Sequence, residues 1–382
     1  MTSAYEEIVE RIGREGPIGF DAFVELALYG EGGFFTRARG AGRAGRDFVT
    51  SPEIGPLFGA LVARALDGWW RDAAAPDPFL VIEAGAGRGR LARDVLASAP
   101  ACAPALRYVL VERSPGLRAA QLDLLDIEPF EDALGPMVRD DEDAPVPVSG
   151  MGPIVTALDD LPAVGLEGLL FANELVDNLP FRIVERRDGV WWEVRVAADR
   201  DALVESVVPA AGELVAEADL VVANAPDGAR VPVPVALVEW LRACAVAVRR
   251  GRLVVVDYVA TGTELVARGQ PGWLRTYRGH DRGVAPLVTP GEQDLTIDVP
   301  REYLVHAADR VGFHLERDIT QAEWLRELGI DDLVAEARDQ WDARAHVGDL
   351  EAVRHRSRVT EGAALADPAG LGAHRVLVFS TR

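Results

Sequence analysis

Cysteine, histidine and long apolar runs are scarce in this chain of 382 residues, which has two cysteines and six histidines. Cys102 and Cys244 are too few for a disulfide framework, and neither residue type recurs at the spacing of a zinc site, so no metal is predicted. No apolar run approaches the ~20 residues of a membrane-spanning helix. The acidic residues 1–16 lack the apolar core of a targeting peptide. We therefore expect a soluble, cytoplasmic protein without a membrane partner.

Positive charge is also in short supply. Lysine and arginine number 40 against 61 aspartates and glutamates, which gives a formal net charge of −21. That balance argues against nucleic acid as a partner, because nucleic-acid binding depends on lysine and arginine contacts to phosphates. Apolar residues make up 49% of the chain. A chain of this length and composition can bury a large core and exceeds one average domain.

The most informative segment is FLVIEAGAGRGRLARDVL, residues 79–96. An apolar run precedes the glycines and apolar residues at helical spacing follow them, which predicts a strand, a tight turn and a helix. Gly85, Gly87 and Gly89 let the backbone turn sharply and approach a ligand without an intervening Cβ. This order is typical of the first unit of a nucleotide-type α/β domain, with its ligand at the carboxyl end of the strand. A purely structural turn is the alternative.

The glycine spacing distinguishes between two cofactors. The third glycine of a dinucleotide fingerprint would stand at position 90, where this chain has arginine. The pattern Glu83-x-Gly85-x-Gly87-x-Gly89 resembles motif I of class I S-adenosylmethionine (SAM) methyltransferases instead. The next apolar strand ends in Glu112, and an acid at that point typically accepts hydrogen bonds from ribose hydroxyls. Both NAD and SAM contain a ribose, so Glu112 supports an adenosine ligand without choosing between them.

Strand-like and helix-like segments alternate along the chain. The expected strands are 79–84, 107–112, 153–157, 168–173, 252–258 and the C-terminal HRVLVFSTR, and the expected helices are 88–99, 115–125 and 234–249. This alternation predicts a doubly wound parallel sheet. Residues 181–196 predict a hairpin about Asp188-Gly189. We expect Ser51 to cap a helix, residues 356–371 to form a loop, and Trp191-Trp192 to be a candidate partner surface, with simple packing as the alternative.

Several unusual segments together resemble one family. They are ALYGEGGFF (27–35), DFVTSPEIGPLFG (47–59), VIEAGAGRGRLARDVL (81–96), FANELVDNLPFRIV (171–184), VVVDY (254–258), TPGEQDLTIDV (289–299) and TQAEWLRELGI (320–330). In this order, along nearly the whole chain, they resemble the MidA-type SAM-dependent methyltransferases. Mitochondrial members of that family are complex I assembly factors reported to methylate arginine on a complex I subunit.

The resemblance implies a fold and a division into domains. The fold is the class I SAM-dependent methyltransferase fold, α/β and Rossmann-like, with a seven-stranded, mostly parallel sheet. Residues 1–75 would form a helical N-terminal cap and residues 76–382 the SAM-binding methyltransferase domain, with an insertion at about 178–250 that carries the hairpin. The chain departs from the family at Arg46-Asp47-Phe48, Phe34-Phe35, Val259 and Leu371-Gly372. These departures concern the substrate side.

The resemblance and the residue types together give a candidate site. For SAM binding we expect Glu83, Gly85, Gly87, Gly89, Glu112, Tyr29, Thr50, Ser51 and Glu53, the last three opening a helix N-terminus that suits a carboxylate. For the chemistry we expect Glu174, Asn173 and Asp177, because carboxylates orient a guanidinium by paired hydrogen bonds. Phe34, Phe35, Asp257 and Tyr258 would line the substrate pocket. Plain capping by Asn173 and Asp177, and plain packing of the aromatics, are the alternatives.

The expected function is SAM-dependent methyl transfer, with a protein arginine as the acceptor by resemblance. Methylation of a small metabolite, or a non-catalytic assembly factor that keeps the fold, are the alternatives. An NAD-dependent oxidoreductase is disfavoured by the glycine spacing. The sequence leaves open the acceptor atom and whether the protein forms a homodimer.

Overall fold

The computed structural model describes residues 2–37, 50–133, 135, 137–138, 146–163, 165–278 and 281–381. Arg46-Asp47-Phe48, one of the departures from the family, lies outside the described residues. Among the described residues, no helix is long and apolar enough to cross a membrane, and no group of histidine, cysteine and acidic side chains could hold a metal ion. Both cysteines are buried and unpaired.

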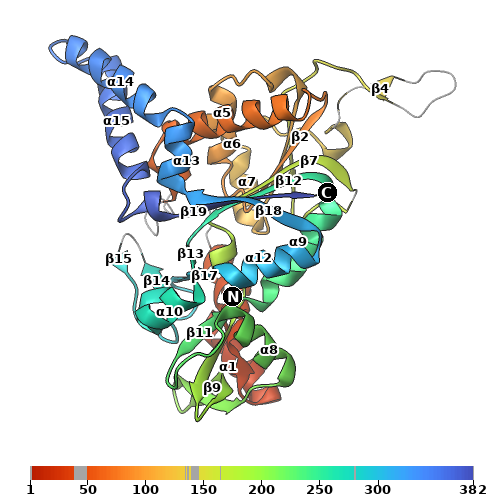
Figure 1. Ribbon diagram of the computed structural model, residues 1–382, viewed down its shortest axis with the longest axis vertical. Helices are drawn as coiled ribbons and strands as arrows, with labels where there is room; N and C mark the ends of the chain where they lie inside the picture. The colour runs from red at the N-terminus through yellow and green to blue at the C-terminus, as the bar shows by residue number, and fades with distance from the viewer. Residues whose placement is uncertain are drawn as a thin grey trace.

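A seven-stranded sheet forms the centre of the molecule, in the order β18-β19-β12-β7-β2-β3-β6 (Figure 1). The strands are β2 (Phe79–Ala84), β3 (Leu106–Val111), β6 (Ile154–Leu158), β7 (Leu166–Asn173), β12 (Val248–Asp257), β18 (Phe313–Thr320) and β19 (Arg375–Thr381). Neighbouring strands are parallel from β6 to β12, whereas β19 is antiparallel to both β12 and β18 and so runs opposite to the other six strands. This confirms the predicted class I fold.

The strand order places a binding crevice between β2 and β7. From β2 the chain moves outward to β3 and β6, and it then returns to β7 on the other side of β2. At such a switch point the loops that leave the carboxyl ends of the two strands diverge, and ligands bind in the crevice between them.

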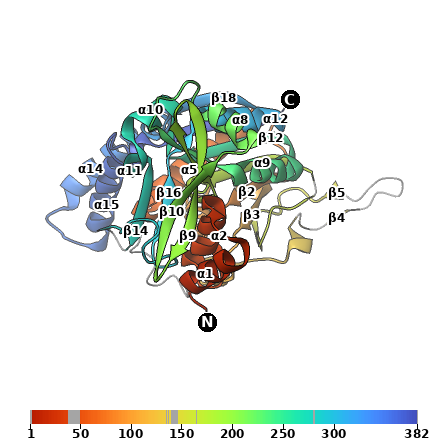
Figure 2. The ribbon, with the colours of Figure 1, turned by 90° about the horizontal axis from the view of Figure 1, so that it is seen from below.

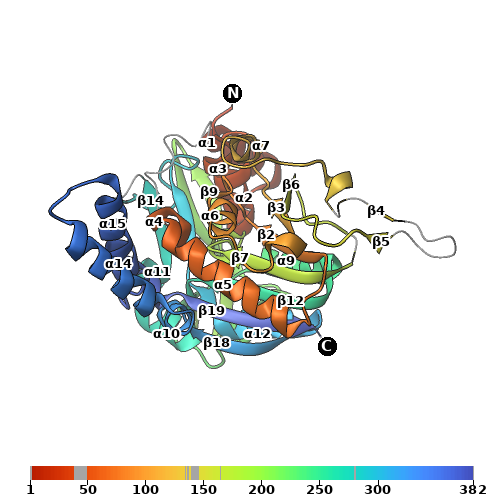
Figure 3. The ribbon, with the colours of Figure 1, turned by 90° about the horizontal axis from the view of Figure 1, so that it is seen from above.

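Alternating apolar residues of each central strand face two separate cores. On β2, Leu80 and Ile82 belong to one core, and Phe79 and Val81 to the other. The second core is closed by α5 (Pro56–Asp72), α6 (Arg90–Ala97) and α13 (Gln321–Glu327), and α5 crosses the sheet in Figure 3. The first core, which contains Leu80 and Ile82, is closed by α9 (Val235–Ala247) and α12 (Arg301–Arg310). Burial on both faces explains the continuous apolar runs of these strands.

A second, smaller sheet packs on the first core. It contains β1 (Ile18–Gly19), β8 (Arg182–Arg187), β9 (Val190–Asp199), β10 (Ala202–Pro209) and β11 (Arg230–Val233), with α8 (Gly212–Val221) nearby. The predicted hairpin is confirmed, because β8 and β9 are antiparallel and the turn residues Asp188 and Gly189 have φ of 49° and 75°. Two positive φ values in a two-residue loop suit the right-handed twist of the strands.

The pair Trp191-Trp192 is not an exposed aromatic surface. Trp191 is 3% exposed, and its indole N–H donates to Asp219 at 2.8 Å. Trp192, on the opposite face of β9, is half-buried. Because side chains alternate along a strand, the two rings lie on different faces of β9. Plain packing therefore accounts for Trp191.

The N-terminal segment packs in two places. Helices α1 (Ala4–Glu15) and α2 (Phe20–Tyr29) lie against β9 of the small sheet (Figure 2), followed by α3 (Phe34–Arg37). Helices α4 (Ser51–Ile54) and α5 lie beside α6 of the main sheet. The division into a cap of residues 1–75 and a methyltransferase domain stays a prediction.

The C-terminal region contains a helical hairpin where a loop was predicted. Helices α14 (Ile330–Arg344) and α15 (Leu350–Leu365) project from one side of the sheet (Figure 1). The prediction of a loop over residues 356–371 is wrong up to Leu365. A Cβ on Gly362 would lie 2.3 Å from the Val334 side chain, so the small residues allow the two helices to pack closely. A small-residue composition is therefore not by itself a sign of a loop.

The remaining elements are short. The segment after β12 forms β13 (Val259–Ala260), α10 (Gly262–Arg268), α11 (Gln270–Trp273), β14 (Leu274–Arg278), β15 (Asp281–Arg282), β16 (Asp294–Ile297) and β17 (Val299–Pro300). Elsewhere lie α7 (Pro115–Gln121), β4 (Met137–Val138), β5 (Val146–Pro147) and the 3-10 turns η1 (Ala103–Ala105), η2 (Phe130–Asp132), η3 (Val176–Asn178) and η4 (Leu371–Ala373). Strand β16 packs against η3, directly after β7.

Candidate functional site

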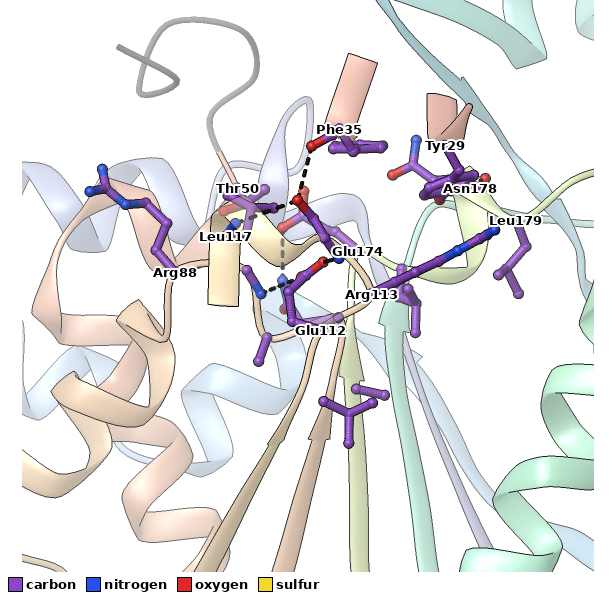
Figure 4. A pocket seen from close by; sticks show the side chains of 18 of the residues that line it. Tyr29, Phe35, Thr50, Arg88, Glu112, Arg113, Leu117, Glu174, Asn178 and Leu179 are labelled. Carbon is purple, nitrogen blue, oxygen red and sulfur yellow. Dashed lines mark hydrogen bonds between the residues drawn. The ribbon is translucent and has the colours of Figure 1, made fainter. Parts of the chain in front are cut away.

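A cavity of about 1180 Å³ lies at the carboxyl ends of β2, β3 and β7 (Figure 4). Most of the predicted site residues line it: Tyr29, Phe34, Phe35, Thr50, Glu53, Glu83, Gly85, Gly87, Glu112, Asn173, Glu174 and Asp177. The other four, Ser51, Gly89, Asp257 and Tyr258, do not line it. The cavity therefore brings together segments that are far apart in the sequence.

The glycine-rich loop after β2 forms one end of the cavity, which we call the glycine end. Gly85 and Gly87 have φ of 70° and 53°, a region that side chains other than glycine rarely adopt. The Gly87 N–H donates to a carboxylate oxygen of Glu112 at 2.9 Å, and the Ser114 N–H donates to the other oxygen at 2.8 Å. A Cβ on Gly87 would meet no atom of the described residues within 4 Å. The backbone at Gly87 thus borders open space in which a ligand can approach it closely.

Gly89 is required for a different reason. It is the N-cap residue of α6 and has φ of 78°, and a Cβ there would lie 2.9 Å from Leu125 Cδ1. The glycine therefore permits the turn and the close packing of the helix, behind the cavity wall.

Two acids border the glycine end. Glu83 is 5% exposed and accepts a hydrogen bond of 2.7 Å from the Tyr108 hydroxyl. Burial raises the pKa of Glu83 to about 8. Burial also raises the pKa of Glu112, against the opposing effect of the two backbone N–H groups that it accepts. Carboxylates held in this way are stabilised by a positively charged ligand nearby.

Aromatic side chains from α2 and α3 close one wall. The Tyr29 hydroxyl donates to the Asn178 carbonyl at 3.2 Å. The Tyr29 ring stacks on the Phe35 ring, with the ring centres 5.6 Å apart. Phe34 meets Phe35 edge-on at 5.2 Å. The Arg113 guanidinium lies 4.6 Å from the centre of the Tyr29 ring. This wall connects the loop after β3 with the turn after β7.

The end of β7 forms the other end of the cavity, which we call the carboxylate end. Glu174 has φ of 50°, an uncommon value for a residue other than glycine. Its Oε1 accepts the Ser51 N–H at 2.9 Å and the Asn173 side-chain amide at 3.1 Å. Glu174 Oε2 and Asn173 Oδ1 are buried and have no hydrogen-bond partner among the described residues. Burial raises the pKa of Glu174 to about 8.

Asp177 places a second buried carboxyl group at this end. It is 1% exposed, lies in η3, and its Oδ1 has no hydrogen-bond partner in the described part of the chain. Burial, followed by the negative charge of Asp257, raises the pKa of Asp177 well above its ordinary value. Unpartnered buried acids are costly unless a ligand or a counter-charge compensates them.

Asp257 and Tyr258 support the carboxylate end from behind. The fully buried Asp257 carboxylate accepts the backbone N–H groups of Leu175 and Val176 at 3.1 and 2.9 Å, which fixes the turn after Glu174. The Tyr258 ring packs 4.0 Å from the ring of the buried His374. The sequence indicated their closeness to the site but not that they lie behind its wall.

Thr50 precedes the first turn of α4, whereas Ser51 was predicted as its cap. The Thr50 N–H donates to Glu53 at 3.4 Å, and Ser51, the first helical residue, is fully buried. Because Pro52 fits any position in the first helical turn, the proline did not fix which residue precedes the helix.

Sequence reasoning missed a third acid of the carboxylate end. Asp294 is 6% exposed, lines the cavity and accepts the Asn178 side-chain amide at 2.9 Å. It lies in TPGEQDLTIDV, which carried the family resemblance but no assigned role. The register of β16 beside η3, which places it there, has no local sequence signal.

The described lining is strongly acidic. Its acidic side chains are Glu53, Glu83, Glu112, Asp159, Asp160, Glu174, Asp177, Glu239, Glu292 and Asp294, and its basic side chains are Arg37, Arg88, Arg90 and Arg113. Such a cavity attracts cations. It suits both a sulfonium cofactor and a cationic acceptor.

Comparison with known proteins gives concordant findings. A family model of S-adenosyl-L-methionine-dependent methyltransferases, Methyltransf_28, matches residues 61–318. The mitochondrial protein arginine methyltransferase NDUFAF7 homolog of Drosophila melanogaster is 28% identical, over 97% of this chain and 83% of that protein. The human mitochondrial protein arginine methyltransferase NDUFAF7 is 29% identical, over 87% of this chain and 74% of that protein.

A solved structure is similar over nearly the whole chain. It is a Burkholderia thailandensis protein bound to S-adenosyl-homocysteine, with 28% identity and a TM-score of 0.79, covering 99% of this chain and 91% of that one. The open space beside Gly87 and the acidic lining fit the same type of cofactor here. The chain belongs to the MidA-type family of SAM-dependent methyltransferases, and its cofactor is SAM.

Proposed function

We propose that this enzyme transfers the methyl group of SAM to a guanidinium nitrogen of an arginine in a partner protein. The observation that carries this proposal is the carboxylate end of the cavity, where Glu174 Oε2 is buried without a partner among the described residues. The names of the relatives, protein arginine methyltransferases at 28–29% identity, support the same acceptor.

The carboxylate end has the acceptors that a guanidinium requires. A guanidinium presents N–H donors in a planar fork. Glu174 Oε2 and Asn173 Oδ1 come from adjacent residues, and each can accept one N–H without giving up an existing hydrogen bond. Asp177 adds a second carboxyl group that compensates the positive charge. Orientation of the reacting nitrogen is the main contribution that we expect from these three residues.

Glu174 is also suited to accept the proton that the guanidinium nitrogen must release. A general base works best when its pKa lies near the operating pH. Burial has raised the pKa of Glu174 to about 8. A bound guanidinium favours the ionised carboxylate by its charge, so Glu174 would bind the acceptor as a carboxylate and then take its proton.

The glycine end would hold the cofactor. When bound, SAM supplies an electrophilic methyl group. Within this end, Gly85 and Gly87 would allow close approach of the backbone, Glu112 would accept ribose hydroxyls, and Glu83 would face the ammonium group. The same ligand would be bordered by Thr50, Glu53 and the wall formed by Tyr29 and Phe35. Gly89 and Ser51 lie behind the cavity wall and would support it without contacting the ligand.

The partner and the location are parts of the proposal. A protein acceptor is proposed because the relatives are named protein arginine methyltransferases, and a monomer and a homodimer are both compatible with the cavity. A cytoplasmic location stays a prediction, because the animal relatives are named mitochondrial.

The test is incubation of the enzyme with radiolabelled SAM and its host lysate, with Glu174→Gln as the control. We expect label in a protein band, mass spectrometry that assigns the added methyl to arginine, and a rate of labelling that is lower by ~10²-fold or more with the variant. Label in the small-molecule fraction would instead favour a metabolite acceptor. Absence of any transfer, with SAM binding intact, would favour an assembly factor that keeps the fold.

A further inference from the structure

A chain of buried hydrogen bonds reaches Glu174 from the C-terminal region. The Ser51 N–H donates to Glu174 Oε1 at 2.9 Å, and the Ser51 hydroxyl donates to Gln321 Oε1 at 3.1 Å. These contacts join positions 123 and 270 residues apart. Ser51 and Gln321 are fully buried, and neither lines the cavity.

Gln321 is itself fixed on two sides. Its backbone N–H donates to the His374 carbonyl at 2.7 Å, and its side-chain amide donates to the Leu365 carbonyl at 3.3 Å. It is the first residue of α13, whose N-cap Thr320 forms a capping box with Glu323. The side-chain oxygen of Gln321 is therefore held in place before it accepts the Ser51 hydroxyl.

We propose that Gln321 is a positioning residue that, through Ser51, fixes the hydrogen bond which holds Glu174 Oε1. This inference rests on the proposed function, because it assigns a role to the surroundings of Glu174. Gln321 of TQAEWL, Ser51 of TSPE and Glu174 of ANE thus form one connected chain of hydrogen bonds. With Oε1 held, Oε2, which has no hydrogen-bond partner among the described residues, is the oxygen left to accept an N–H of the acceptor.

The same hydrogen bond tunes the carboxyl group. An N–H that donates to a carboxylate favours its charged form, and the Ser51 N–H is the strongest influence that lowers the pKa of Glu174 against burial. The Asn173 amide also lowers the pKa of Glu174, and the charges of Asp257 and Glu53 raise it. The charge of Glu174 in turn raises the pKa of Asp177 and of Tyr258. A weaker Ser51 hydrogen bond would therefore raise the pKa of Glu174 further.

The test is direct titration of Glu174 by NMR with ¹³C-labelled glutamate, on the full chain without substrate. Glu174→Gln identifies the resonance. Ser51→Ala removes only the hydroxyl, and Gln321→Met keeps the side-chain length but removes the acceptor. We expect each variant to raise the pKa of Glu174 by about half a unit or more. The double variant should add little to the larger single shift, because the two residues act in series.

Arg64→Met is the matched control. Arg64 also ties the N-terminal region to the C-terminal region, because its guanidinium donates to the Leu328 carbonyl at 2.8 Å, but it does not reach Glu174. We expect no pKa shift at Glu174 in this variant. An unchanged pKa of Glu174 in a folded Gln321→Met variant or in Ser51→Ala, or an equal shift in Arg64→Met, would overturn the positioning role. If Gln321→Met does not fold, Ser51→Ala alone decides.

The titration is independent of catalysis. The proposed function fails if Glu174→Gln turns over normally, whatever the NMR titration shows. The positioning role fails if the pKa of Glu174 stays constant in the variants, whatever the acceptor is. The two failures are therefore distinguishable.

Discussion

The two ends of the cavity are built in opposite ways. The glycine end comes from one local stretch, the loop after β2 with Glu112 at the end of β3, and it presents backbone to its ligand. The carboxylate end is assembled from side chains of β7, η3 and β16, with Ser51 and Gln321 behind them. The first type of construction suits close approach to a cofactor that every turnover uses. The second suits recognition and proton transfer, because buried acids acquire shifted pKa values.

The largest effect that we expect comes from a substitution at the glycine end, which should lower the affinity for SAM. Gly87→Asn should keep the fold, because asparagine tolerates a positive φ and its Cβ would meet nothing within 4 Å in the described part of the chain. Its side chain would nevertheless occupy the open space beside the loop. We expect SAM affinity measured by calorimetry to fall at least ~100-fold, about 2.7 kcal/mol.

The matched control is Gly228→Asn. Gly228 has φ of 84°, is exposed and lies outside the cavity lining, and no atom of the residues that the structure describes lies within 4 Å of an added Cβ. Its substitution should leave SAM affinity unchanged. Undiminished SAM affinity in Gly87→Asn would contradict the assignment of the glycine end to the cofactor.

The next effect concerns the carboxylate end. Glu174→Gln keeps the shape of the side chain but removes its charge and its basicity. We expect turnover to fall by ~10²-fold or more, with SAM affinity and melting temperature almost unchanged. Glu167→Gln, at the exposed start of the same strand, is the control and should turn over normally. Loss of SAM binding or of stability in step with activity would mean that Glu174 is structural.

The smallest effect is a pH dependence of stability at the glycine end. The pKa of Glu83 is about 8 in the folded protein against an ordinary value of 4.5. The folded protein therefore retains a proton that the unfolded chain has lost. The resulting stabilisation is complete below pH 4.5 and disappears as the pH rises through 8.

Urea denaturation without cofactor provides the measurement. Between pH 6 and pH 8 Glu83 should account for a loss of about 2 kcal/mol in the free energy of unfolding. Glu83→Gln should remove that share of the pH dependence. Equal pH dependence in the wild type and the variant would show that the pKa of Glu83 is not raised.

The glycine end was largely predictable because its signals are local. The apolar runs, the three glycines and Glu112 all occur within residues 79–112, and the structure places them on β2, its loop and β3. The parallel sheet followed from the same runs, since strands buried on both faces need apolar residues throughout.

The carboxylate end was only partly predictable because its geometry depends on distant contacts. Asn173, Glu174 and Asp177 were found from one segment, but Asp294 and Gln321 were not assigned a role. Their contacts to Asn178 and Ser51 span 116 and 270 residues. Tertiary packing also placed Asp257 behind the wall and made a helix of residues 356–365, which no local pattern indicated.

The most direct test of the central claim is the pH dependence of kcat/KM for an arginine-containing acceptor, measured in the wild type and in Glu174→Gln. If Glu174 must be ionised to bind and deprotonate the acceptor, kcat/KM of the wild type should rise with pH to a plateau, with a midpoint near the Glu174 pKa of about 8. The rise should be absent from the residual activity of the variant. The same pH profile in both enzymes would contradict the account and would assign the proton transfer to another group.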